Sequence, residues 1–170
     1  MAMQHSRFFI GMGLLLLGLQ AQGRVPGLPD PDLTPGAFNP AITQENIHET
    51  ICSRGWTRTI RPPAQVTNRL KRAQMRIYGL AGQRMRDYEE DHLIPLELGG
   101  APEDPQNLWP QPRDGQWTAA DKDKLEAALR RAVCKGKLSL REAQDMISAN
   151  WVDAFQTLHL RQAGAQFGQQ

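Results

Sequence analysis

Two adjacent residues and one more distant residue have the side chains that hydrolysis needs. Asp91 and His92 stand side by side, and Asn107 follows fifteen residues after His92. A histidine with its ordinary pKa of about 6.5 is mostly neutral at pH 7 and can take a proton from an attacking water. A carboxylate such as Asp91 binds hard divalent cations through oxygen. A base and a divalent cation suffice to cleave a phosphodiester, so we expect His92 to be the base of a hydrolytic site.

Charge is unevenly distributed along the chain. The 170 residues hold 20 Lys+Arg and 18 Asp+Glu, and this net charge of +2 is too small to indicate a nucleic-acid partner by itself. Residues 53–86, however, contain nine basic and no acidic residues, whereas residues 87–112 contain seven acidic and no basic ones. A basic stretch attracts backbone phosphates, and Arg69, Arg72 and Arg76 are its candidate contacts. A solvated helix face explains the same pattern equally well.

The same residues also have ordinary structural interpretations. An aspartate–histidine pair taken alone is more often part of a turn or a surface hydrogen bond, and an isolated Asn107 would cap a loop. Aromatic side chains are more often core than platforms for stacked bases. We therefore expect three tryptophans to pack in the core: Trp109, Trp117 and Trp151.

An extended segment, a loop and a helix must position these residues. Residues 88–97 have an extended pattern that is followed by the Gly99-Gly100 turn and by a Pro-rich loop that reaches Asn107. Thr118 is a predicted N-cap for a helix that continues to Val133. Adjacent residues on a strand point to opposite faces, so a bend is needed to bring the aspartate and the histidine into one site.

Four further elements are predicted around this region. Residues 44–53 are expected to form a short helix and residues 56–60 a strand, because Trp, Thr and Ile favour strands. Residues 66–78 have helical spacing, and residues 140–158 form a last helix that opens with a capping box. There are no internal repeats.

The N-terminal region has the features of an export signal. Arg7 precedes an uncharged run at 8–19, and a small-x-small cleavage pattern ends the signal peptide, residues 1–23. Twelve apolar residues span about 18 Å as a helix, too short for a membrane of about 30 Å, so no stable membrane association is expected after cleavage. Residues 24–40 are a Pro/Gly-rich linker or extended tail, and 41–170 form a single domain. The protein is predicted to be exported, either periplasmic or secreted.

Export also determines how the two cysteines are interpreted. In an oxidising compartment Cys52 and Cys134 are most simply one disulfide, which would close a loop of about 80 residues and stabilise the fold by roughly 4 kcal/mol. The alternative is two buried free thiols. Neither arrangement makes the cysteines catalytic.

The order and spacing of several motifs resemble the core of the HNH, or His-metal-finger, endonucleases. Asp91-His92, Pro95, Gly99-Gly100 and Asn107-Leu108 precede a helix, and the wider layout is similar to a set of exported bacterial HNH nuclease-like proteins. This resemblance implies an α+β fold, mainly helical, around a ββα-metal core at about 88–134, stapled by one disulfide. It further implies that Asp91 ligates a metal, that His92 is the base, and that Asn107 bonds backbone across the loop to orient His92.

The helix departs from the family pattern because it has no histidine. Asp123 and Glu126 lie three residues apart on one helix face and could supply oxygen ligands instead. Alternatively, an aspartate there interacts with the helix dipole and Glu126 pairs with Arg130. An all-oxygen site would favour Mg²⁺, with Mn²⁺ or Ca²⁺ as alternatives, over zinc.

The sequence thus predicts an exported, metal-dependent HNH-like endonuclease of low sequence specificity, acting on DNA or RNA as a monomer. The alternative is a non-catalytic exported module that binds nucleic acid or metal on a degenerate HNH core. A structural protein with an incidental cation site is a third interpretation, although it does not explain a histidine within the acidic block.

Overall fold

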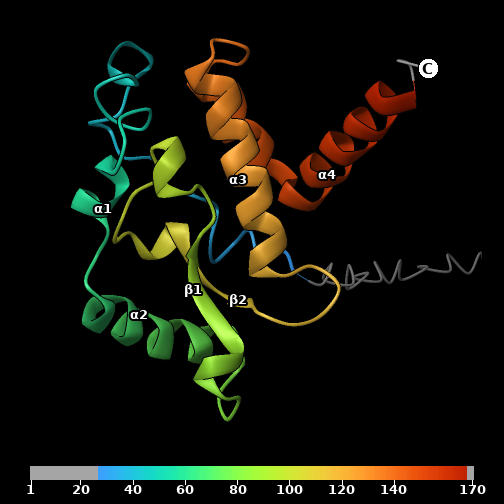
Figure 1. Cartoon of the computed structure of the whole chain (residues 1–170). Helices are drawn as coiled ribbons and strands as arrows, with labels where there is room; N and C mark the ends of the chain where they lie inside the picture. The colour runs from blue at the N-terminus through green and yellow to red at the C-terminus, as the bar shows by residue number, and fades with distance from the viewer. Residues whose placement is uncertain (1–26, 168–170) are drawn as a thin grey trace, which may run out of the picture.

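The computed structural model describes residues 27–167, and the predicted signal peptide lies outside them. The described chain is α+β, with a small antiparallel hairpin between helices (Figure 1). In Figure 1, α2 crosses one side of the hairpin, and α3 and α4 lie on the other side. The helices and strands are α1 (Trp56–Ile60), α2 (Ala64–Ile77), β1 (Tyr88–His92), β2 (Leu108–Pro112), α3 (Ala119–Cys134) and α4 (Leu140–Phe167), with short 3-10 turns between them.

The hairpin places the motif at its loop end. β1 and β2 pair antiparallel, with Asp91 opposite Trp109 and His92 opposite Leu108. The pairing ends at this point, because the chain continues into a loop that contains two 3-10 turns. Gln74 of α2 donates its side-chain N–H to the Leu108 carbonyl at 2.9 Å, which fastens α2 to β2. The expected strand, loop, strand and helix order is present.

The strand predicted at residues 56–60 is not formed. Residues 56–60 form α1 rather than a strand, because no described neighbouring strand offers them a ladder, and strand propensity depends on such pairing. Gly55 enters the helix with a φ of 82°, which favours glycine. Arg61 is extended because Pro62 follows it, and α1 therefore ends at Ile60. Trp56 packs against the core instead of along a sheet.

α3 and α4 begin where capping signals were predicted, but α4 is longer than predicted and the helix predicted at 44–53 is not formed. The Thr118 hydroxyl bonds Asp121 at 2.9 Å, and α3 begins at the next residue. The predicted helix at 44–53 is only a 3-10 turn, Gln44–Asn46, followed by further turns. The last helix runs to Phe167 with a break at Asn150, whose side-chain oxygen accepts the Val152 and Asp153 N–H groups as a new N-cap.

The core lies between α3, α4 and the turns after Thr43. Trp151 is fully buried and Trp109 is 2% exposed, whereas Trp117 packs edge-on to Trp151 at 6.3 Å, so the three tryptophans lie in or against the core as predicted. Residues 27–40 contain a turn at 31–33 and lie against the domain rather than forming a free linker. Thr34 is fully buried, and the Trp151 indole donates to the Gly27 carbonyl at 2.9 Å.

The predicted disulfide is present. Cys52 and Cys134 are bonded across 82 positions and join the turns before α1 to the end of α3. A loop of this length corresponds to a stabilisation of about 4 kcal/mol in the chain-entropy model.

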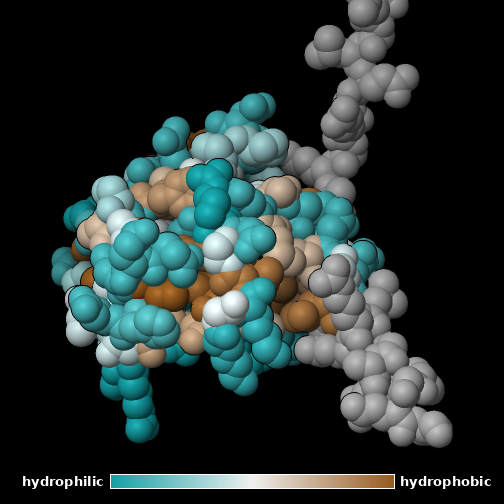
Figure 2. All heavy atoms as spheres, turned by 90° about the horizontal axis from the view of Figure 1, so that it is seen from above, coloured by the Kyte–Doolittle hydropathy of each residue, from teal (hydrophilic) through white to brown (hydrophobic). Residues whose placement is uncertain are grey.

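The outer surface is mixed in character. Figure 2 shows a hydrophobic strip bordered by hydrophilic residues on one face. No helix within residues 27–167 is long and apolar enough to cross a membrane.

Candidate functional site

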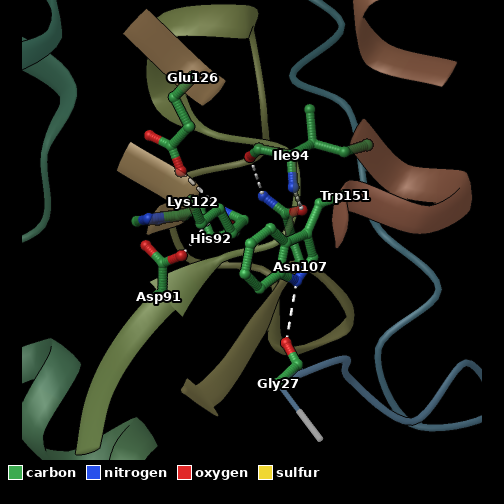
Figure 3. Close-up of polar contacts among 8 residues, drawn as sticks. All are labelled: Gly27, Asp91, His92, Ile94, Asn107, Lys122, Glu126 and Trp151. Carbon is green, nitrogen blue, oxygen red and sulfur yellow. Dashed lines mark hydrogen bonds and ion pairs between the residues drawn. The ribbon is translucent and has the colours of Figure 1, made fainter. Parts of the chain in front are cut away.

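Asn107 joins both ends of the loop that follows β1. It is fully buried, and its side-chain oxygen accepts the Ile94 N–H at 2.9 Å and the Ala37 N–H at 3.3 Å. Its amide donates to the Ile94 carbonyl at 2.9 Å (Figure 3). The same amide donates to the Ala101 carbonyl at 3.0 Å. These contacts use two donors and two acceptor sites, which is the full capacity of the amide. Asn107 therefore fixes the loop backbone, as expected from the sequence.

Gly100 is required by the same arrangement. A Cβ at this position would lie 1.7 Å from the Ile94 oxygen and 2.8 Å from the Asn107 side-chain nitrogen. Any side chain would therefore push the loop away from Asn107. The second glycine of the Gly99-Gly100 pair thus allows a close backbone approach, while Gly99 turns the chain with a φ of 76°.

The loop also sets the tautomer of His92. His92 is 4% exposed, and its Nε2 lies 2.9 Å from the Pro102 carbonyl oxygen. Since a carbonyl only accepts, Nε2 carries the hydrogen, and Nδ1 of the neutral ring is the unprotonated nitrogen. Burial lowers the pKa of His92, as do the Lys122 and Arg61 cations, while the Pro102 bond and Asp91 oppose the shift. The ring is thus held neutral with one nitrogen able to accept a proton.

A cleft with cationic walls opens beside His92. It has a volume of about 290 Å³ and lies between β1, α2 and the loop before α2. Arg61, Lys71 and Arg113 line it together with His92. Arg113 pairs with Glu89 at 2.8 Å and Lys71 donates to the Tyr88 carbonyl, whereas the exposed Arg61 side chain has no hydrogen bond or ion pair with any residue in the described range. The cleft can therefore bind an anion such as a phosphate.

Glu90 adds a neutral carboxyl to this cleft. Because strand residues two apart share a face, Glu90 lies on the same side of β1 as His92. Neither carboxyl oxygen has a hydrogen-bond partner among the described residues, and burial raises the pKa of Glu90 to about 8. The raised pKa favours the protonated form of Glu90 at neutral pH, so the carboxylate that offsets a cation in this cleft is Glu89, through its pair with Arg113.

Lys122 joins the carboxylates of β1 and α3. Its side chain is fully buried, and its ammonium lies 2.8 Å from Asp91 Oδ2 and 2.5 Å from Glu126 Oε1 (Figure 3). The third N–H donates to the His92 carbonyl at 2.6 Å. The two carboxylates and their hydrogen bonds raise the pKa of Lys122 and outweigh burial, so the ammonium stays charged. Burial also raises the pKa of Glu126, an effect that Lys122 opposes.

The expected metal ligands are therefore only partly brought together. Asp91 and Glu126 meet through Lys122, while Asp123 lines a neighbouring pocket of about 250 Å³ that Arg61, Glu97 and Glu126 share. Burial, and next the Asp91 charge, raise the pKa of Asp123. The part of the chain that the structure describes contains no group of three or more His, Cys, Asp or Glu side chains that could hold a metal ion. The donor set does not fit a divalent cation between Asp91 and Glu126.

The predicted pair between Glu126 and Arg130 is absent. Glu126 pairs with Lys122, four residues before it, and Arg130 instead donates to the Ile51 carbonyl at 2.6 Å. Arg130 lies 4.0 Å from the Glu97 carboxylate.

Arg69, Arg72 and Arg76 lie on an exposed face of α2. The residues of α2 that line the His92 cleft are Ala64, Thr67, Asn68 and Lys71. On a helix that turns about 100° per residue, these two sets occupy different faces. The three arginines could contact a long polyanion outside the cleft but do not line it.

Sequence reasoning missed Arg61, Lys71, Glu90, Arg113 and Lys122 as members of the site. The single local signal was the i, i+4 spacing of Lys122 and Glu126 on α3, which is typical of a helical ion pair. Glu90 lies on β1 and Arg113 follows β2, whereas Arg61 and Lys71 reach the cleft through the packing of α2 and its preceding loop on the hairpin.

No protein-family model, curated protein or solved structure matches the chain.

Proposed function

We propose that the protein is an exported HNH-like endonuclease that hydrolyses nucleic-acid phosphodiester bonds with little sequence preference. The observation that carries this proposal is the state of His92: Nε2 donates to the Pro102 carbonyl, which leaves Nδ1 as a base at a cationic cleft. The resemblance of the Asp91-His92 and Asn107 motifs to HNH endonucleases also supports it.

The cleft residues suggest how the chemistry would proceed. A water bound at His92 gives its proton to Nδ1 and attacks phosphorus, and the bond to the leaving oxygen breaks. Negative charge grows on the phosphoryl oxygens in this step, and the cations of Arg61, Lys71 and Arg113 stabilise it. Solvent supplies the proton for the leaving oxygen. Asn107 acts indirectly, because it holds the loop whose Pro102 carbonyl orients the imidazole.

The test is cleavage by the mature chain, residues 24–170, with its disulfide intact. Plasmid DNA, single-stranded DNA and RNA are each incubated with wild type and His92→Ala, in Mg²⁺ and in EDTA. The matched control is His48→Ala, which removes an exposed histidine outside the cleft. We expect wild type and His48→Ala to cleave and His92→Ala to lose at least about a hundredfold in rate, the usual contribution of a general base. Equal cleavage by wild type and His92→Ala would refute the assignment.

A non-catalytic nucleic-acid-binding module is the second candidate. The observation that favours it is the ion pairing of Lys122 with Asp91 and Glu126, which places an ammonium between the two carboxylates where a metal ion would bind. Salt-sensitive binding of the same nucleic acids without any cleavage product would support this candidate instead.

A further inference from the structure

We propose that the Lys122 ammonium is the resident cation of this site and that it takes the position a divalent metal ion would need between Asp91 and Glu126. The consequence for catalysis, that cleavage at His92 needs no metal, rests on the proposed function. The occupancy of the position between Asp91 and Glu126 by the Lys122 ammonium is independent of the proposed function.

The three contacts of Lys122 resemble a set of metal ligands. Two carboxylate oxygens and one backbone carbonyl oxygen surround the nitrogen at 2.5–2.8 Å. Oxygen ligands of these types are the ones that hard divalent cations select. An ammonium has three N–H donors, and here each donor has one acceptor, so the nitrogen is fully satisfied.

Burial makes this arrangement difficult to displace. Lys122 is fully buried, and removing a charged partner from a buried pair leaves the other charges uncompensated. A divalent cation at the same point would first have to expel the ammonium or release its proton. Each of the three ammonium N–H groups already has an acceptor: Asp91, Glu126 or the His92 carbonyl. The position between the two carboxylates is therefore occupied, and a second cation there would have to replace the ammonium.

Lys122 also links the cation position to the histidine. Its bond to the His92 carbonyl fixes the end of β1, while the Pro102 carbonyl fixes the ring of the same residue. Lys122 is thus a positioning residue whose ammonium fastens α3 to the backbone that carries the proposed base.

The experiment is a titration of the oxidised mature chain with Mn²⁺. Binding is measured by calorimetry and by the electron paramagnetic resonance signal of free Mn²⁺. The variants are Lys122→Ala and the double variant Lys122→Ala/Glu126→Gln. The matched control is Lys124→Ala, which removes an exposed lysine from the same helix. We expect no saturable binding to wild type or Lys124→Ala. Lys122→Ala should gain one Mn²⁺ site, at least about tenfold tighter than any in wild type, and the double variant should lose it.

Two results would overturn the proposal. One is stoichiometric Mn²⁺ binding to wild type that Asp91→Asn abolishes, a measurement that stays decisive if Lys122→Ala does not fold. The other is cleavage by wild type that EDTA abolishes and Mg²⁺ restores. Cleavage that persists in EDTA supports both proposals. Absence of both metal binding and cleavage supports the role of Lys122 and refutes the proposed function.

Discussion

Asn107→Asp tests whether the loop next to His92 depends on one amide. The substitution keeps the shape of the side chain and its acceptor contacts with the Ile94 and Ala37 N–H groups. It removes both donors, so the Ile94 and Ala101 carbonyls lose their partners at 2.9 and 3.0 Å. Each lost bond removes about 1 kcal/mol, and each buried unpaired group adds a penalty of about 1–3 kcal/mol. We expect a loss of about 4–8 kcal/mol in the free energy of unfolding at pH 7.

The loss of unfolding free energy in Asn107→Asp should depend on pH. Burial beside two carbonyls favours the protonated form of the introduced carboxyl, so its pKa in the folded state should exceed the unfolded value of about 3.9. For a raised folded pKa, the folded state holds more protons above the unfolded pKa, and stability falls as pH rises through this window. The deficit relative to wild type should therefore be smaller at pH 4 than at pH 7.

Urea unfolding, monitored by tryptophan fluorescence, measures the loss of stability at pH 7 and its dependence on pH, because Trp109 and Trp151 are buried. The matched control is Asn39→Asp. Its side-chain oxygen accepts the exposed Ala41 N–H, a bond that a carboxylate also makes. A loss for Asn107→Asp below about 1 kcal/mol, or equal to that of Asn39→Asp, would refute the reasoning.

Three further predictions concern the loop and the cleft. Gly100→Ala should destabilise the fold by about 3 kcal/mol or more in urea unfolding, because a Cβ 1.7 Å from the Ile94 oxygen forces the loop to move; a loss near zero would contradict this. Because the folded-state pKa of Glu90 is raised from 4.5 to about 8, wild type should lose stability as pH rises between these values, by at most about 5 kcal/mol. Glu90→Gln should flatten this profile of unfolding free energy against pH. Parallel profiles for wild type and Glu90→Gln would exclude a contribution of the Glu90 titration to stability. Arg61→Gln should slow cleavage at least about tenfold, whereas Arg69→Gln should only weaken binding in low salt; equal cleavage rates for the two variants would argue against the cleft.

The sequence predicted the elements with strong local signals. α3 and α4 begin directly after Thr118 and Ser139, where side chains satisfy N–H groups of the first turn: Asp121 accepts the Thr118 N–H, and Ser139 accepts the Glu142 N–H. The turn at Gly99-Gly100 and the position of Asn107 also followed from local spacing. The strand expected at 56–60 did not form, since propensity does not provide a neighbouring strand.

The cleft could be predicted only in part. His92 and Asp91 were identified from their types, but Lys122 was not, because a lysine on an amphipathic helix is normally exposed. Its burial depends on the packing of α3 against β1, which local patterns do not specify. Arg61 and Lys71 reach the cleft for a similar reason, since the turn at Pro62 and the placement of α2 are tertiary features.

The pH dependence of cleavage is the most direct test of His92 as the base. The measurement compares kcat/KM against pH with the titration of the His92 imidazole followed by NMR. We expect an acid limb of slope one whose midpoint equals that of His92 and lies below the ordinary pKa of 6.5, since burial disfavours the imidazolium. An acid limb that persists in His92→Ala with the rate of wild type would contradict the account.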